Sequence, residues 1–509
     1  MKKIKYNLFV IVTLMAIITN TSCKKVLDVN VDPNNPLDAT SNLILPAAQV
    51  ELGLTVGNTW NYVGCMWAQY WTGGYGVSTA NLEYYNMNTA DVEGAWTRAY
   101  ARTLADIDAM NKKDEVIYAG IGKIMSAYIY QMIVDLHGDA PFSEALKGPE
   151  GILTPKFDKP EDVYAALIPL IDEGLDQINQ EGAINPKTGV EYLVPTSNDL
   201  IYAGNLAKWK IFANTLKLKV LVRQGNKFAE AKALMDAPGS VFISSSSDEC
   251  KLQYFGSSSN TNPLYARFVS RTATGMYYVA ANSSVQTLVN LGDPRKNKIY
   301  TSGTGAGGNE GVNSGDINDN TTLYPSGGLN TRFCRPSTST FGANVPLFII
   351  SSWESKFLQA EVLSRIGGFD AQATALFEEA VTLSCAYYSV TGAPVSSYLT
   401  SLAFSGKTSD EQLDIIGVQK WISMNGLQMA EGWLETLRFD RDNHHMFTGA
   451  ITGPAGNTYV DSIYTSPINT TLGANKYPTS FIYPTQETSL NPNTPANRRV
   501  TDRRFWDAD

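Results

Sequence analysis

The chain has 509 residues, with 40 lysines and arginines against 49 aspartates and glutamates, which gives a net charge of −9. Since no basic cluster follows the first residues, the phosphate backbone of nucleic acid is not an expected partner. Only three histidines are present, so neither a histidine-rich metal site nor another cofactor is expected. The sequence neither predicts nor excludes a calcium ion bound by carboxylates.

The N-terminus has the pattern of an export signal. Three lysines within the first five residues precede an apolar run at residues 8–18, which is too short to span a bilayer as a helix. Thr21 and Ser22 then place small residues directly before Cys23, as lipoprotein processing requires, although Asn20 stands where leucine is usual. We expect Cys23 to become the lipidated first residue. The alternative is an ordinary signal peptide with an incidental cysteine.

The predicted organisation has three parts: a lipoprotein signal peptide at residues 1–22, a lipidated tether at 23–38 and a single domain at 39–509. Length alone suggests about three domains, but no proline- or serine-rich linker divides the chain. No second apolar run is long enough to cross a membrane, so the polypeptide is expected to be held at a surface only by its lipid.

The other four cysteines are Cys65, Cys250, Cys334 and Cys385, and they contain no C-x-x-C pair. They permit two disulfides in an exported chain without selecting a connectivity. We expect free, buried thiols instead, because so large a domain needs no covalent staples.

An aromatic segment at residues 60–85 follows a predicted helix near 46–54. Three glycines between residues 73 and 76 interrupt it, so residues 71–81 are expected to form a loop. The rings that recur at helical spacing before this loop are expected in the core: Trp60, Trp67 and Tyr70.

Residues 121–136 predict a helix that is buried nearly all round, because apolar side chains cover both of its faces. His137 and Gly138 end this helix, and a helix predicted at 92–110 is expected to pack against it. The motif D-x-x-G-D-x-P-x-S-E-A starts at Asp135 and, taken alone, indicates a helix stop and a turn. In that interpretation the acidic side chains bind nearby backbone; catalytic use of Asp135, Asp139 and Glu144 is the weaker alternative.

The remaining helices come mostly in pairs. After a helix at 159–180, the predicted pairs are 207–223 with 227–235, 351–365 with 370–384, and 410–424 with 427–437. The second pair carries the A-x3-F-x2-A pattern of a tetratricopeptide second helix at Ala373, Phe377 and Ala380. The serine- and glycine-rich middle, residues 240–345, predicts loops, and loops on a repeat scaffold are where binding surfaces usually lie.

In this order, the segments resemble the SusD/RagB-like nutrient-binding lipoproteins of Bacteroidota. The resemblance covers nearly all of the mature chain, and five motifs carry it: the turn after Asp135, W-x-x-x-A-N-x-L-x-L at 209–218, D-P-R at 293–295, E-G-W-L-E-x-L-R at 431–438 and the Y-P-x-x-E segment within 481–491. It implies a mostly α fold, a tetratricopeptide-like helical-repeat scaffold with long irregular loops.

The resemblance also implies a function: capture of a nutrient, most often an oligosaccharide, at the outer membrane, with delivery to a SusC-like TonB-dependent transporter. The protein would be lipid-anchored and face the cell exterior. A peptide ligand is one alternative, and a lipid-anchored glycoside hydrolase is another. The sequence contains no G-x-S-x-G, H-E-x-x-H or phosphate-binding G-x-x-x-x-G-K motif, so we do not expect an enzyme.

Aromatic residues are the better signal for a ligand site, since a sugar ring packs its C–H face on an indole or phenol ring. In glycan-binding relatives the site is built by the early aromatic loop and the middle loops. The alternative is that several of these rings belong to the core. The residues that match the relatives' site are Trp71, Tyr75, Tyr84, Tyr277 and Tyr278 for stacking, and Asn81 or Arg271 for polar contacts.

Overall fold

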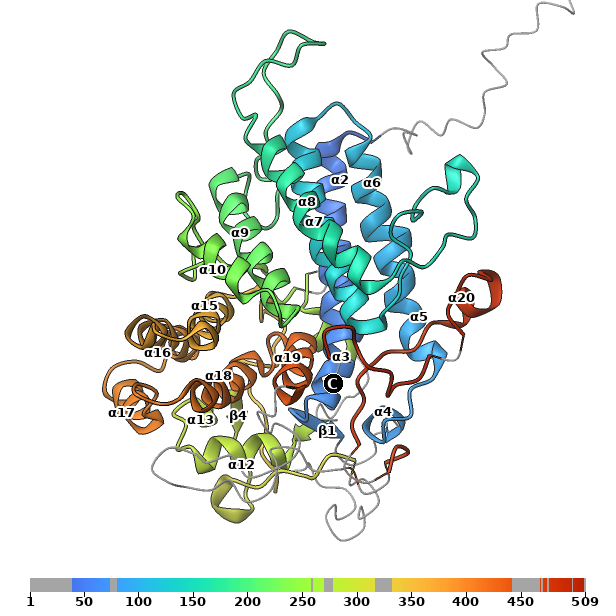
Figure 1. The fold of residues 1–509 in the computed structure, drawn as a ribbon. Coiled ribbons are helices and arrows are strands. Elements are labelled where there is room, and N and C mark those ends of the chain that lie inside the picture. Colours follow the sequence, from blue (N-terminus) through green and yellow to red (C-terminus); the bar gives the residue numbers. More distant parts are fainter. Residues whose placement is uncertain are drawn as a thin grey trace, which may run out of the picture.

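The structure is a computed structural model that describes residues 39–73, 80–257, 260–269, 278–315, 332–441, 467, 470–473, 476–496 and 498–507. The predicted signal peptide, Cys23 and the tether therefore lie outside the described residues. Within these ranges the chain is mostly helical, as predicted, and its helices form one continuous arrangement (Figure 1). No described helix is long and apolar enough to cross a membrane.

The N-terminal half is built from long helices that lie side by side (Figure 1). The predicted helix at 92–110 is present but is interrupted by a π-helical turn. In chain order the elements are α2 (Ser41–Thr55), η1 (Val56–Trp60), α3 (Asn61–Trp67), α4 (Ala80–Glu83), α5 (Thr89–Arg98), η2 (Ala99–Leu104), α6 (Ala105–Asn111), α7 (Val116–His137), η3 (Gly148–Glu150) and α8 (Pro160–Ile178).

The central helix of this half is α7, which packs against α6 on one side and α8 on another. All of its residues except Val116 and Lys123 are buried, which confirms the prediction of a helix buried nearly all round. Its contact with α8 is close at Gly120 and Gly174, where a Cβ on either glycine would lie 2.7–2.8 Å from the other's carbonyl oxygen. Side chains at these two positions would force the helices apart.

The second half contains the predicted helix pairs. They are α9 (Leu206–Arg223) with α10 (Phe228–Asp236), α15 (Ser352–Ile366) with α16 (Asp370–Tyr387), and α18 (Ser409–Met424) with α19 (Met429–Arg441). Two further helices, α17 (Ala393–Leu402) and α20 (Thr485–Leu490), lie outside these pairs. Ala373, Phe377 and Ala380 are buried, and the Phe377 ring stacks on Phe404 with centroids 4.1 Å apart. The phenylalanine thus fills the space between neighbouring helices, as the repeat pattern predicts.

The middle region contains more regular structure than its composition predicts. The described residues include three two-stranded antiparallel sheets: β1 (Trp71–Gly73) with β3 (Tyr278–Ala280), β2 (Cys250–Leu252) with β6 (Leu347–Ile350), and β4 (Tyr300–Thr301) with β5 (Arg335–Pro336). Short helices lie between them: α11 (Pro263–Val269), α12 (Asn282–Asn290), α13 (Lys296–Ile299) and η4 (Ala306–Gly308). These elements are too short to show a periodicity, so the sequence suggested loops.

A network of buried charges holds the helices of both halves together. Arg223 on α9 pairs with Glu431 and Glu435 of α19, and its Nε lies 3.2 Å from Asp135 at the end of α7. The other pairs are Lys219 with Glu354 and Glu431, Lys420 with Glu435, and Arg438 with Glu361 and Glu435. Every member is at most 5% exposed, so each charge depends on its partners rather than on water.

The electrostatics of Glu435 show how strongly the network is coupled. Burial alone would raise the pKa of this carboxyl group, but the charges of Arg438, Lys420 and Arg223 hold it well below its ordinary value. The carboxylate is therefore charged at neutral pH, and removing one of these cations would leave its burial less well compensated.

The motif after α7 binds the C-terminal segment. Asp135 accepts hydrogen bonds from Tyr164 Oη at 2.6 Å and Trp506 Nε1 at 2.8 Å. The expectation that Asp135 binds nearby backbone is therefore wrong: its partners are distant side chains that the sequence does not reveal. At Gly138, where φ is +87°, a Cβ would lie 2.7 Å from Arg498 Nη2, so glycine leaves room for that guanidinium.

The other acidic residues of the motif have structural partners. Asp139 pairs with Lys159 at 2.6 Å, and Glu144 accepts the Lys156 backbone N–H at 2.8 Å. The four described cysteines are free and buried, as expected. No group of three or more histidine, cysteine or acidic side chains that could hold a metal ion occurs in the part of the chain that the structure describes.

The buried network gives a stability prediction. Arg223→Met should lower the free energy of unfolding by roughly 3–5 kcal/mol, because Asp135 loses its ion-pair partner inside the protein and Glu431 and Glu435 each lose one of theirs. Chemical denaturation measures this change. Lys187→Met is the matched control: it removes a cation whose side chain is 69% exposed and pairs with Asp114, so the change should stay below about 1 kcal/mol. Equal changes in the two variants would contradict the role given to burial.

Candidate functional site

The candidate site lies around the β1–β3 ladder, which joins the early aromatic segment to the middle region. In this ladder Trp71 pairs with Ala280 and Gly73 pairs with Tyr278. The backbone N–H of Ala281 also donates to Tyr70 O at 3.0 Å, which extends the contact by one residue. Two regions about 200 residues apart in the chain are thus brought together, as the resemblance implied.

The Glu83 carboxylate binds several hydrogen-bond donors at this ladder. Its carboxylate accepts the Gly73 N–H at 2.7 Å and the Thr72 hydroxyl at 2.9 Å, and the Gly315 N–H also donates to it. Burial raises the pKa of Glu83 from 4.5 to about 7, against these hydrogen bonds, which lower it. A neutral carboxyl group can replace the carboxylate near pH 7, and it too can accept these donors.

Aromatic rings surround the ladder. Tyr278 meets Tyr62 edge to face, with ring centroids 6.4 Å apart. The Trp71 ring meets Phe341 at 5.6 Å, and Phe341 in turn lies 5.2 Å from Tyr265 of α11. Phe341 and Tyr265 are half-buried residues.

The Arg267 guanidinium lies among these aromatic rings. Arg267, also on α11, stands 4.4 Å above the Tyr62 ring and donates from Nη1 to Asn58 Oδ1 at 2.6 Å. A cation–π contact and a hydrogen bond hold the guanidinium in place while the residue stays partly exposed. Arg267 therefore adds a positioned guanidinium group to the candidate site.

Two of the predicted ligand-binding residues belong to the core. Trp71 is fully buried, packs on Phe341 and donates from Nε1 to Asn425 Oδ1 at 3.2 Å. The prediction of an exposed Trp71 ring is therefore wrong, because β1 turns the indole inward, where its N–H has a partner. Tyr278 is only 6% exposed and packs on Tyr62, so it is not an open platform either.

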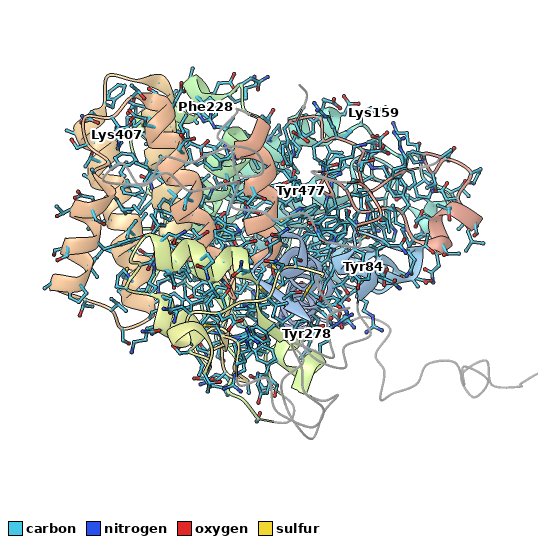
Figure 2. All side chains as sticks on the ribbon, turned by 90° about the horizontal axis from the view of Figure 1, so that it is seen from below. Tyr84, Lys159, Phe228, Tyr278, Lys407 and Tyr477 are labelled. Atoms are coloured by element: carbon cyan, nitrogen blue, oxygen red, sulfur yellow. The ribbon has the colours of Figure 1, made fainter. Side chains whose placement is uncertain are left out.

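Two other predicted residues remain candidates. Asn81 is exposed and Tyr84 is half-buried, and both belong to the segment at α4 beside the ladder. Figure 2 shows Tyr84 and Tyr278 on the same side of the molecule. Tyr75, Arg271 and Tyr277 lie outside the described residues, and their roles stay predictions.

The sequence did not single out Tyr265, Arg267 or Phe341. Tyr265 and Arg267 lie in the short segment P-L-Y-A-R-F, which is too short to show a helical periodicity. Phe341 gives no local signal, because only the fold brings it to Tyr265. The predicted core rings Trp60, Trp67 and Tyr70 are buried, as expected.

The fold is that of a helical-repeat protein in which aromatic residues gather around a short strand ladder. The comparisons agree: the family model SusD-like, described as "Starch-binding associating with outer membrane", matches residues 33–445. The chain therefore belongs to the SusD-like family of outer-membrane nutrient-binding proteins, which are non-catalytic. A comparison with curated proteins finds no significant match.

Solved structures share the fold. A chitin-binding protein has a TM-score of 0.70 and 22% identity over 91% of this chain and 100% of its own. A SusD homologue from Bacteroides uniformis has a TM-score of 0.71 and 19% identity over 92% and 99%. A SusD/RagB family protein from Bacteroides thetaiotaomicron has a TM-score of 0.69 and 20% identity over the same shares. At these identities the similarity shows the fold alone.

Glu83 gives a pH prediction. Its folded-state pKa, about 7, lies above the ordinary value of 4.5, so the folded protein binds the extra proton between these pH values. The resulting stabilisation is complete below about pH 4.5 and is lost as the pH rises through 7, with a total on the order of 3 kcal/mol. Denaturation at several pH values, on parent and Glu83→Gln, measures it. The difference in unfolding free energy between them should change across this window; a constant difference would contradict the raised pKa.

Proposed function

We propose that the protein captures an oligosaccharide at the cell surface and delivers it to a SusC-like TonB-dependent transporter. The observation that carries the ligand class is the set of half-buried aromatic residues around the β1–β3 ladder: Tyr84 after α4, and Tyr265 and Phe341, whose ring centroids lie 5.2 Å apart. Rings of this kind stack on sugar faces, while amide and guanidinium N–H groups bind hydroxyl oxygens.

The proposed ligand-binding residues are Asn81 and Tyr84 from the original prediction, together with Tyr265, Arg267 and Phe341. Tyr75, Arg271 and Tyr277 are proposed on the resemblance alone. One of the structurally similar proteins is a chitin-binding protein, which supports a sugar rather than a peptide as the ligand.

The proposed location follows from the N-terminal sequence. Residues 1–22 act as a signal peptide, Cys23 carries the lipid, residues 23–38 form the tether, and residues 39–509 form one nutrient-binding domain. The lipid holds the domain at the outer membrane, on the outside of the cell, where it can act as a lid on the transporter.

Tyr84 provides the test of the ligand site. Loss of one stacking ring with its buried area should cost on the order of 2 kcal/mol, so Tyr84→Ala should weaken oligosaccharide binding about thirtyfold. Asn81→Ala, which removes one hydrogen-bonding group, should cost about 1 kcal/mol. Calorimetry with chitin and starch oligosaccharides measures binding, and thermal melts report stability.

Two controls separate binding from folding. Tyr192→Ala removes a half-buried tyrosine from the loop between α8 and α9 and should leave affinity unchanged. Trp71→Ala should instead lower stability by roughly 3–5 kcal/mol, as expected for a core ring. A Tyr84→Ala protein that binds like the parent would exclude Tyr84 from the site.

A further inference from the structure

Exposed apolar side chains gather in one region of the molecule. The described residues include eleven large apolar side chains that are exposed, and six of these belong to α2 or to the loop between α8 and α9. They are between 44% and 61% exposed and form what we call the α2 surface: Leu43, Val50, Ile184, Val190, Leu193 and Leu200. Where exposed apolar groups lie next to one another, they mark a contact with a protein or a membrane.

Hydrogen bonds join the two segments of the α2 surface. Gln49 on α2 donates to Asp199 Oδ1 at 2.7 Å and accepts the Leu200 N–H at 2.7 Å. Closer to the start of α2, Asn198 Nδ2 donates to Asn42 O at 3.2 Å. The loop is therefore fixed on the helix, and the apolar side chains of both segments belong to one surface.

The outer part of the loop is a small hairpin. Ile184 and Glu191 form an antiparallel bridge, and the Asn185 N–H donates to Val190 O at 2.7 Å. This part of the loop extends beyond the ends of the neighbouring helices in Figure 1. Ile184, Val190 and Leu193 thus present aliphatic groups on a projecting element.

The α2 surface lies where the described chain begins. Ser41, the first residue of α2, follows the segment that leads back to Cys23. Cys23 and Ser41 are 18 residues apart, so the start of α2 stays within about 65 Å of a lipid on Cys23. The β1–β3 ladder lies at the opposite end of the helices α2 and α3, which follow one another along the chain (Figure 1).

We propose that the α2 surface is a second membrane contact, whose aliphatic side chains rest at the boundary between headgroups and acyl chains. The inference rests on the lipid anchor in the proposed function. The six side chains are aliphatic, and Leu43 follows the proposed lipid anchor by only 20 residues, which favours lipid over a protein partner. A lipid chain and an apolar surface together hold a protein more firmly than either does alone.

Two valines allow a matched test. Val190 on the hairpin is 61% exposed, and Val241, in the loop after α10, is 51% exposed. Val190→Cys and Val241→Cys are each labelled with an environment-sensitive fluorophore under native conditions, where the four natural thiols are buried. The full lipidated proteins are then incorporated into phosphatidylethanolamine vesicles that contain brominated lipid. Quenching at position 190 should exceed quenching at position 241 about threefold.

The outcomes separate this inference from the anchor. If the proteins float with the vesicles but both labels are quenched equally, the membrane contact is wrong while the anchor stands. If the parent floats no better than Cys23→Ser, the anchor is wrong and the inference fails with it. If the label at position 190 is unquenched in vesicles and is shielded from water only when a transporter is co-purified, the surface binds protein and the proposal is overturned.

Discussion

The buried charge network is the constraint on which the arrangement of the helices depends. Arg223 of α9 reaches Asp135 of α7 and Glu431 of α19, and Arg438 of α19 reaches Glu361 of α15. Moving a charge into the interior costs free energy that its partners only offset, so such a network adds little net stability. It does restrict geometry, because any shift between these helices leaves a buried charge without its partner.

This restriction extends through α3 to the proposed ligand site. Gly64 of α3 packs so closely on α19 that a Cβ there would lie 2.4 Å from Ala430 Cα. Farther along, the Tyr70 hydroxyl donates to Trp421 O at 2.7 Å, and its ring stacks on Trp421 of α18. The helices held by the network thus fix α3 and the residues after it, which places β1 against β3. A site built in this way is largely formed before a ligand arrives, which reduces the entropy cost of binding.

Most of the helical scaffold could be predicted from sequence, because long helices repeat apolar residues at a constant spacing. The buried helix α7 and the A-x3-F-x2-A pair of α15 and α16 are examples of such local signals. The strands around the site could not be predicted, since β1 and β3 each have three residues and pair across about 200 residues of chain.

The sequence pointed to the part of the chain in which the candidate site lies, but it did not identify which side chains belong to that site. Trp71 stands beside glycines in an aromatic segment, which suggested an exposed ring, yet its indole N–H binds Asn425, 354 residues away. The same limit applies to Phe341 and Tyr265, whose contact depends on the fold. Asp135 also follows this pattern: its motif was found, but its partners Tyr164 and Trp506 come from other elements.

The most direct test of the account is hydrogen exchange of the parent protein with and without chitin or starch oligosaccharides. If a glycan stacks at the β1–β3 ladder, backbone amides in residues 80–85, 263–267 and 278–281 should exchange more slowly when it is bound, while residues 181–200 at the opposite end stay unchanged. A glycan that binds but slows exchange only outside the ladder region would contradict the central claim that this aromatic surface is the nutrient site.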